Sequence, residues 1–283
     1  MDVYLQLIKP RITTLILLVA MAAFAIASGG SLDWRRFIIM TLLTGLLASG
    51  IFALNAYLER DTDALMGRTK GRPLPSRRLP AGQALAFGVI CTVAAVVLMG
   101  ARLGLVVGAL GAFTFVTYVL VYTPLKRRSV LHTAIGALSG ATPPLIGWAS
   151  VHGTLDPGAW VLAGIMFLWQ VPHFLSIESM YRDDYAKAGI RVLPVTEPTG
   201  SAAASVMVVA LGVLLPWSAA PFLVGISGTV ALAGSLAAGA GFLAAGIVHL
   251  LRRTKTSARV VLRASIIYLP AVFAFLVFAG AAR

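Results

Sequence analysis

The sequence is poor in charged residues. Asp, Glu, Lys and Arg make up only 12% of its 283 residues, whereas a soluble globular domain has about 25%. Hydrophobic residues make up 59% of the chain, and the mean hydropathy is +0.90. This balance excludes an ordinary soluble enzyme and favours a protein that lies within a membrane.

Cysteine is almost absent. The single cysteine, Cys91, lies inside an apolar run, so the chain cannot form an internal disulfide. The segment from Met1 to Pro10 lacks both an Arg- and Ser-rich amphipathic pattern and a cleavage pattern. It therefore predicts neither a transit peptide nor a signal peptide.

Nine long apolar runs fill most of the chain. A membrane-spanning helix needs about 20 apolar residues, and lipid leaves no partner for backbone groups outside the segment. The runs lack the alternation of a barrel strand, so the sequence predicts an all-α, polytopic membrane protein forming one domain over residues 1–283. The expected helices are 12–30, 37–58, 83–101, 103–123, 130–151, 158–180, 202–222, 227–250 and 260–282.

The basic residues predict the orientation of these helices. The net charge of +13 would suggest nucleic-acid binding in a soluble protein, but here the cations stand in short clusters between apolar runs. With the N-terminus in the cytoplasm, 19 of the 23 Lys and Arg residues fall on the cytoplasmic side, as the positive-inside rule requires. We expect a membrane protein with its N-terminus and polar loops in the cytoplasm, its C-terminus outside and no nucleic-acid partner.

The acidic residues gather on the same side. Seven of the ten carboxylates lie at the ends of the second and sixth predicted helices or in the loops 59–82 and 181–201. Carboxylates at membrane depth are costly unless they are paired or bind a cation. The two loops therefore predict a functional site at the cytoplasmic mouth of a central cavity.

The first acidic cluster follows Asn55. In a continuous helix Asn55, Glu59 and Asp63 share one face, whereas Asp61 points away from it. Mg²⁺ prefers oxygen ligands, often one or two carboxylates together with substrate phosphates. Basic residues follow, as a diphosphate would require. The alternative is a helix end with ordinary i,i+4 ion pairs and a solvated basic loop.

The second acidic cluster contains Asp183 and Asp184. Asp183 and Lys187 could form a simple surface pair four residues apart. Two clusters on one side of the membrane instead favour a metal–diphosphate site held between them.

Several motifs together resemble the UbiA superfamily of intramembrane prenyltransferases, in the branch that farnesylates heme. The resemblance extends over about residues 9–200. The matching segments are Asn55-Ala-Tyr-Leu-Glu-Arg-Asp-Thr-Asp63, Gly67-Arg-Thr-Lys-Gly-Arg-Pro-Leu-Pro75, Tyr122-Thr-Pro-Leu-Lys-Arg-Arg128, Gly140-Ala-Thr-Pro-Pro-Leu-Ile-Gly-Trp148, Trp169-Gln-Val-Pro-His-Phe174 and Tyr181-Arg-Asp-Asp-Tyr-Ala-Lys-Ala-Gly189.

The chain departs from the superfamily pattern at a few positions. Ala56 stands where the wider superfamily has an acid, and Glu59 replaces an aspartate. In the second motif, Tyr181 and Tyr185 occupy the places of two aspartates. Arg191 also departs from the branch pattern, and the sequence offers no explanation for it.

The resemblance implies transfer of a farnesyl group from farnesyl diphosphate to the 2-vinyl group of heme b. Water is added, and the products are heme O and diphosphate. By matching position, the resemblance assigns metal–diphosphate binding to Asn55, Glu59, Asp63, Asp183 and Asp184, with Asp61 second to these. It assigns diphosphate oxygens to Arg68, Arg72, Lys126 and Arg127. The expected cofactor is Mg²⁺, and heme b is a substrate.

His173 is a candidate ligand of the heme iron. It follows Pro172, which disrupts the helix locally, and neutral imidazole is a common axial ligand. A packed histidine that bonds a freed backbone carbonyl is the equally weighted alternative. A further expected partner is a downstream heme-modifying enzyme or an oxidase assembly factor.

Two other functions fit parts of the pattern. A polyprenyltransferase for an aromatic quinone precursor would share the metal site but should carry two acids four apart in the second motif. A transporter should place its charged groups near the bilayer centre, whereas here they lie at one mouth. Both alternatives are therefore ranked below heme farnesylation.

Overall fold

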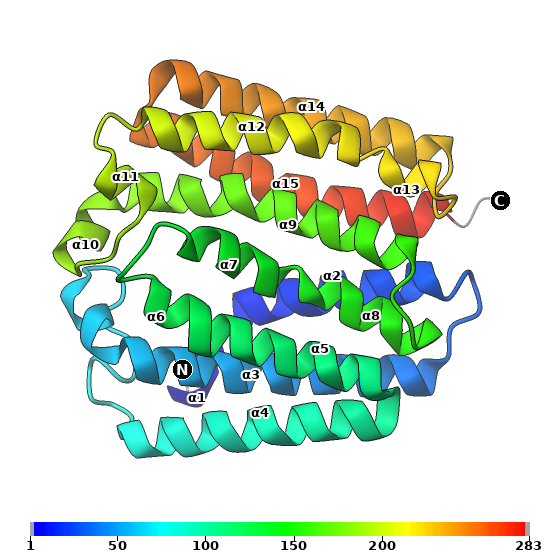
Figure 1. Cartoon of the computed structure of the whole chain (residues 1–283), viewed down its shortest axis with the longest axis horizontal. Coiled ribbons are helices and arrows are strands. Elements are labelled where there is room, and N and C mark those ends of the chain that lie inside the picture. Colours follow the sequence, from blue (N-terminus) through cyan, green and yellow to red (C-terminus); the bar gives the residue numbers. More distant parts are fainter. Residues whose placement is uncertain (1–2, 281–283) are drawn as a thin grey trace.

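The computed structural model describes residues 3–280, and all their regular elements are helices lying roughly parallel (Figure 1). Eight segments are long and apolar enough to cross a membrane, which confirms a multi-pass membrane protein. They are α2 (Pro10–Ala27), α3 (Trp34–Leu65), α4 (Ala81–Leu103), α5 (Leu105–Phe115) with η1 (Val116–Tyr122) and α6 (Thr123–Leu125), α9 (Pro157–Met180), α12 (Ser201–Trp217) with α13 (Ala220–Leu223), α14 (Thr229–Arg252) and α15 (Lys255–Gly280).

The remaining predicted span, 130–151, is two short helices rather than one. Helix α7 (His132–Gly140) ends before Ala141, and α8 (Thr142–His152) begins just before Pro143 and Pro144. Proline lacks an N–H and restricts the residue before it, so these two prolines interrupt the backbone ladder. Neither helix alone reaches the length of a span.

The outer surface of the bundle is apolar. Large hydrophobic side chains on several different helices are more than half exposed, including Leu42, Ile90, Val209, Ile267 and Phe278. A soluble monomer rarely exposes so much apolar surface. This surface is suited to contact with lipid tails.

Helix α3 extends further than the sequence predicts. It runs without interruption from Trp34 to Leu65 instead of ending near residue 58. At its start, Asp33 caps the helix by accepting a hydrogen bond from the Arg36 backbone N–H at 3.0 Å. The last two turns therefore carry Glu59, Asp61 and Asp63 as parts of one rigid helix.

The fourth spanning segment contains a π-helical stretch, η1. The Thr123 backbone N–H donates to the carbonyl of Tyr118, five residues earlier, and the Thr123 hydroxyl donates to the same carbonyl at 2.8 Å. Such insertions within α-helices often lie at functional sites. This one ends four residues before Lys126.

Four basic segments lie at one end of the bundle. In Figure 1, α10 (Arg182–Lys187), α6, the loop after α3 and the turn between α14 and α15 occupy the same end. The short helices α1 (Val3–Leu7) and α11 (Leu193–Thr196) complete the described elements. Both predicted functional loops are thus brought to a common end.

Candidate active site

Asn55, Glu59 and Asp63 form a polar stripe along α3, and each of them has a cationic partner from another segment. Lys9 donates to Asn55 Oδ1 at 2.9 Å, and Lys126 Nζ lies 2.6 Å from Glu59 Oε1. The third pair joins Asp63 Oδ2 to Arg72 at 2.7 Å. The unbroken helix places the three oxygen-bearing side chains on one face, as the spacing predicts.

These pairs are largely shielded from water. The side chains of Glu59 and Lys126 are only 13% and 17% exposed, and Asn55 and Asp63 are buried. Charge–charge interactions are stronger here than at an open surface. The alternative of a solvated helix end therefore does not describe this cluster.

The cations around the stripe repel one another. Burial and the neighbouring Arg72 guanidinium lower the pKa of Lys9 to about 7. Burial also opposes the charge of Lys126, but the Glu59 carboxylate outweighs it and holds the pKa of Lys126 well above its usual range. An anion bound among these cations would relieve the repulsion.

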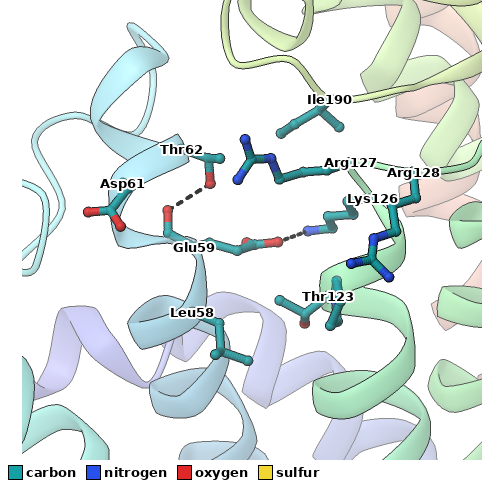
Figure 2. Close-up of a pocket in the computed structure, with 10 residues that line it drawn as sticks. Leu58, Glu59, Asp61, Thr62, Thr123, Lys126, Arg127, Arg128 and Ile190 are labelled. Atoms are coloured by element: carbon teal, nitrogen blue, oxygen red, sulfur yellow. Dashed lines mark hydrogen bonds and ion pairs between the residues drawn. The ribbon is translucent and has the colours of Figure 1, made fainter.

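A cavity of about 420 Å³ opens beside the Glu59–Lys126 pair (Figure 2). Arg127 and Arg128 line it from the segment after α6, and Asp61 and Thr62 line it from the end of α3. The Asp61 side chain is 87% exposed and lies 3.8 Å from Arg60. Asp61 thus points away from the stripe, as predicted, yet borders the same cavity.

The second loop packs against the first. Met66 is buried in a small cluster with Ala188, Ile190 and Val192. A methyl group placed on Gly67 would come within 3.7 Å of Asp184 Oδ1, so the Asp184 carboxylate lies against the first loop. The two predicted clusters are therefore neighbours.

Arg68 joins the same two loops. Its guanidinium stacks over the rings of Tyr181 and Tyr185, 4.8 and 4.6 Å from their centroids. Cation–π contacts of this kind fix a guanidinium without neutralising it. The two tyrosines that replace superfamily aspartates thus hold a predicted diphosphate-binding arginine.

Asp183 does not join the site. Its carboxylate pairs with Lys255 at 3.0 Å, and the two side chains are 72% and 64% exposed. The Lys255 ammonium lowers the pKa of Asp183. The predicted i,i+4 partner, Lys187, does not form an ion pair with it within the part of the chain described.

The predicted metal ligands do not form one cluster. Asn55, Glu59 and Asp63 lie on one face of α3, Asp184 lies against the first loop, and Asp183 pairs with Lys255 at the surface. Within residues 3–280, no three His, Cys, Asp or Glu side chains lie together so as to hold a metal by themselves. Buried Asp63 Oδ1, however, has no hydrogen-bond partner in this range. An all-oxygen donor set with one free carboxylate oxygen fits Mg²⁺ that is shared with a phosphate.

His173 lies deeper in α9. Its Nδ1 is 2.8 Å from the Ser265 hydroxyl, and its ring stacks on Trp169 with centroids 4.7 Å apart. Fixing one ring nitrogen in this way sets the orientation of a metal-binding imidazole. The partner of Nδ1 is thus the Ser265 hydroxyl and not a backbone carbonyl freed by Pro172.

Four residues at the charged end of the bundle have no role assigned to them from the sequence. Lys9 and Arg128 are described above. Arg191 links the second loop to the cavity wall, because its backbone N–H donates to the Lys126 carbonyl at 2.9 Å. Buried Glu178 accepts from Thr133 at 3.0 Å, and within the described residues its Oε2 has no partner. A carboxylate inside the end of an apolar run is the sequence signal that could have identified it.

The bundle and its charged mouth define a class of membrane-embedded enzyme that handles an anionic substrate. A model of the UbiA prenyltransferase family matches residues 16–280, and the chain belongs to this family. It is 44% identical over 279 residues to the protoheme IX farnesyltransferase of Solibacter usitatus, covering 95% of this chain and 96% of that one. It is 39% identical to the protoheme IX farnesyltransferase of Salinibacter ruber, covering 96% of each chain.

Solved structures have the same fold. A digeranylgeranylglyceryl phosphate synthase superposes with a TM-score of 0.83 at 16% identity, covering 99% of this chain and 98% of that one. A UbiA homologue from Archaeoglobus fulgidus bound to GPP and Mg²⁺ gives a TM-score of 0.66 at 14% identity, covering 97% of this chain and 99% of that one. Both confirm the predicted fold class.

Proposed function

We propose that the protein transfers the farnesyl group of farnesyl diphosphate to the 2-vinyl group of heme b, with addition of water, and releases heme O and diphosphate. The observation that carries this proposal is the gathering of Lys9, Arg72 and Lys126 on one polar stripe beside a cavity. Relatives at 39–44% identity are named for this activity.

The cationic side chains bind the diphosphate and stabilise it as it leaves. Lys126 and Arg127 line the cavity, and Arg68 and Arg72 reach the loops around it. Mg²⁺ would be held by Asn55, Glu59 and Asp63 with Asp184 on the facing loop, and when bound it would supply further positive charge to the phosphate oxygens. Asp183 and Asp61 stand outside this set and are second to it.

The allylic carbon–oxygen bond breaks, and the diphosphate leaves with the electron pair. Tyr118 and Tyr122, whose ring centroids are 4.9 Å apart, offer aromatic faces to the farnesyl cation. The vinyl π electrons then form the new carbon–carbon bond. The cation moves to the vinyl carbon attached to the porphyrin.

Water adds to this second cation and must lose a proton. Glu178 offers the acceptor, because its Oε2 is buried and has no hydrogen-bond partner among residues 3–280. Thr133 fixes the other oxygen at 3.0 Å. Positioned acid–base groups of this kind contribute about 10²–10⁴ to a rate.

His173 holds the heme through its iron. With Nδ1 bonded to Ser265, Nε2 is the nitrogen for coordination, and the stacked Trp169 ring restricts rotation. An axial ligand fixes the porphyrin and brings one vinyl group to the farnesyl carbon.

The protein lies in the inner membrane of a bacterium with its N-terminus and charged mouth in the cytoplasm. The concentration of basic segments at one end supports this orientation. Heme O passes to a downstream heme-modifying enzyme or oxidase assembly factor. The whole chain, 1–283, forms one catalytic domain.

Expression in a host that lacks heme farnesylation tests the function. Extracted heme should gain the mass of one farnesyl group and one hydroxyl group, and the Glu59→Gln variant, expressed to the same level, should leave heme b unchanged. A prenylated aromatic acid with unmodified heme would instead identify a quinone-pathway enzyme.

A further inference from the structure

A second cavity lies at the charged end of the bundle, on the side of α10 where Asp183 pairs with Lys255. It has a volume of about 190 Å³ and shares no lining residue with the first cavity. Three cationic side chains line it: Arg182 after α9, Arg253 at the end of α14 and Lys255 at the start of α15. Positive charge from separate segments thus converges on one hollow.

The cations are held in place by the surrounding chain. Arg182 donates to the Pro198 carbonyl at 2.9 Å, which fixes its guanidinium at the cavity wall. Arg253 caps α14 with a left-handed backbone, φ 48°, a conformation uncommon for residues other than glycine. Lys255 pairs with Asp183, which also lines the cavity.

Negative charge in the cavity is insufficient to balance these cations. Asp183 is the one carboxylate among the lining residues, against three cations. The nearby Glu197 is turned to the start of α12, where its two oxygens accept from the backbone N–H groups of Thr199 and Ala202, both at 3.0 Å. The cavity therefore retains an excess of positive charge.

We propose that this second cavity binds the phosphate group of an anionic molecule at the membrane surface. It lies where three spanning helices end, which is the depth of lipid headgroups, and basic pockets between such helices bind anionic headgroups. Arginine forks suit phosphate oxygens. An anionic phospholipid and free inorganic phosphate share this chemistry, and neither depends on the proposed farnesyl transfer.

The test compares two pairs of substitutions that remove the same charge. Arg253→Gly with Lys255→Gln empties the cavity of two cations, and glycine suits the left-handed backbone. Arg252→Gln with Arg259→Gln removes two exposed cations from the same corner that do not line the cavity. Thermal unfolding in detergent establishes that both double variants fold.

Purified protein is titrated with phosphatidylglycerol, phosphatidylcholine and inorganic phosphate. Native mass spectrometry counts the bound lipids, and calorimetry measures the binding of phosphate. We expect a bound anion whose affinity falls about tenfold or more in the cavity pair, since charged hydrogen bonds are lost, and stays unchanged in the control pair.

Selective binding of phosphatidylglycerol over phosphatidylcholine identifies a lipid headgroup. Binding of inorganic phosphate alone, with the same dependence on the cavity pair, identifies a free anion. Equal weakening in both pairs means general surface attraction and overturns the proposal. Failure of both phosphatidylglycerol and phosphate to bind the unmodified protein also overturns it.

Discussion

The two acidic clusters have similar residue types but opposite surroundings. At the end of α3, Glu59 and Asp63 are shielded and each pairs with a cation from another segment. In α10, Asp183 is 72% exposed and pairs with an exposed lysine. Exposed ion pairs contribute about 0–1 kcal/mol, whereas removing one partner of a buried pair costs about 3–5 kcal/mol.

The difference shows that acidic residues near a membrane surface are not equivalent. The first cluster holds several shielded charges on one continuous helix. The second cluster approaches the candidate site mainly through Asp184, which lies against Gly67. Substitutions that remove one carboxylate at a time can separate these roles.

The largest effects are expected at the first cluster. Glu59→Gln and Asp63→Asn should each lower turnover by at least about a hundredfold, because a group that stabilises the departing charge is lost. Purified enzyme is assayed for heme O formation with Asp156→Asn, a substitution at the other end of the bundle, as control. Near-normal activity in both variants would remove the stripe from the mechanism.

Glu178 tests whether the end of α9 also carries a buried functional acid. Glu178→Gln should lower kcat by about a hundredfold, the lower end for a proton acceptor, with little change in the KM for either substrate. Thr133→Val is the matched control for the loss of the hydrogen bond alone. Equal losses in the two variants would make Glu178 a packing residue.

His173 tests whether heme binds apart from both clusters. His173→Ala should weaken heme binding roughly tenfold or more and shift the Soret band, as loss of a metal ligand does. Affinity for farnesyl diphosphate should stay the same. A normal heme spectrum with normal heme affinity would show that His173 does not bind the heme iron and only packs against Ser265 and Trp169.

The smallest effects are expected at the exposed carboxylates. Asp183→Asn and Asp61→Asn should each change turnover less than about fivefold, because exposed charges interact weakly. Asp184→Asn should fall between these variants and Glu59→Gln. A loss at Asp183 as large as that at Glu59 would mean that α10 rearranges when substrates bind, contrary to the contrast drawn between the clusters.

Local patterns predict much of the fold. Long apolar runs locate the spans, and clusters of cations identify the end at which the loops meet, because both depend on composition along a short segment. The sequence predicts one span over 130–151 where the structure has two helices, since this run has the length of a span and its two prolines alone do not distinguish a kink from two helices.

The site is only partly predictable for a similar reason. Helical spacing places Asn55, Glu59 and Asp63 on one face, but it carries no information on partners far along the chain. Lys9 lies 46 residues from Asn55, and Lys126 lies 67 residues from Glu59. Such pairings depend on how the helices pack, which the sequence of one segment does not specify.

The π-helical stretch η1 determines the direction in which the following side chains point. Each residue of an α-helix rotates the backbone by about 100° around the helix axis. In η1 the hydrogen bonds reach back five residues instead of four, so each residue rotates the backbone by less. If the same residues formed a regular α-helix, Lys126 would be turned through about 100°, away from Glu59. The position of a candidate diphosphate-binding cation thus depends on the backbone conformation of a segment that does not itself touch the carboxylate.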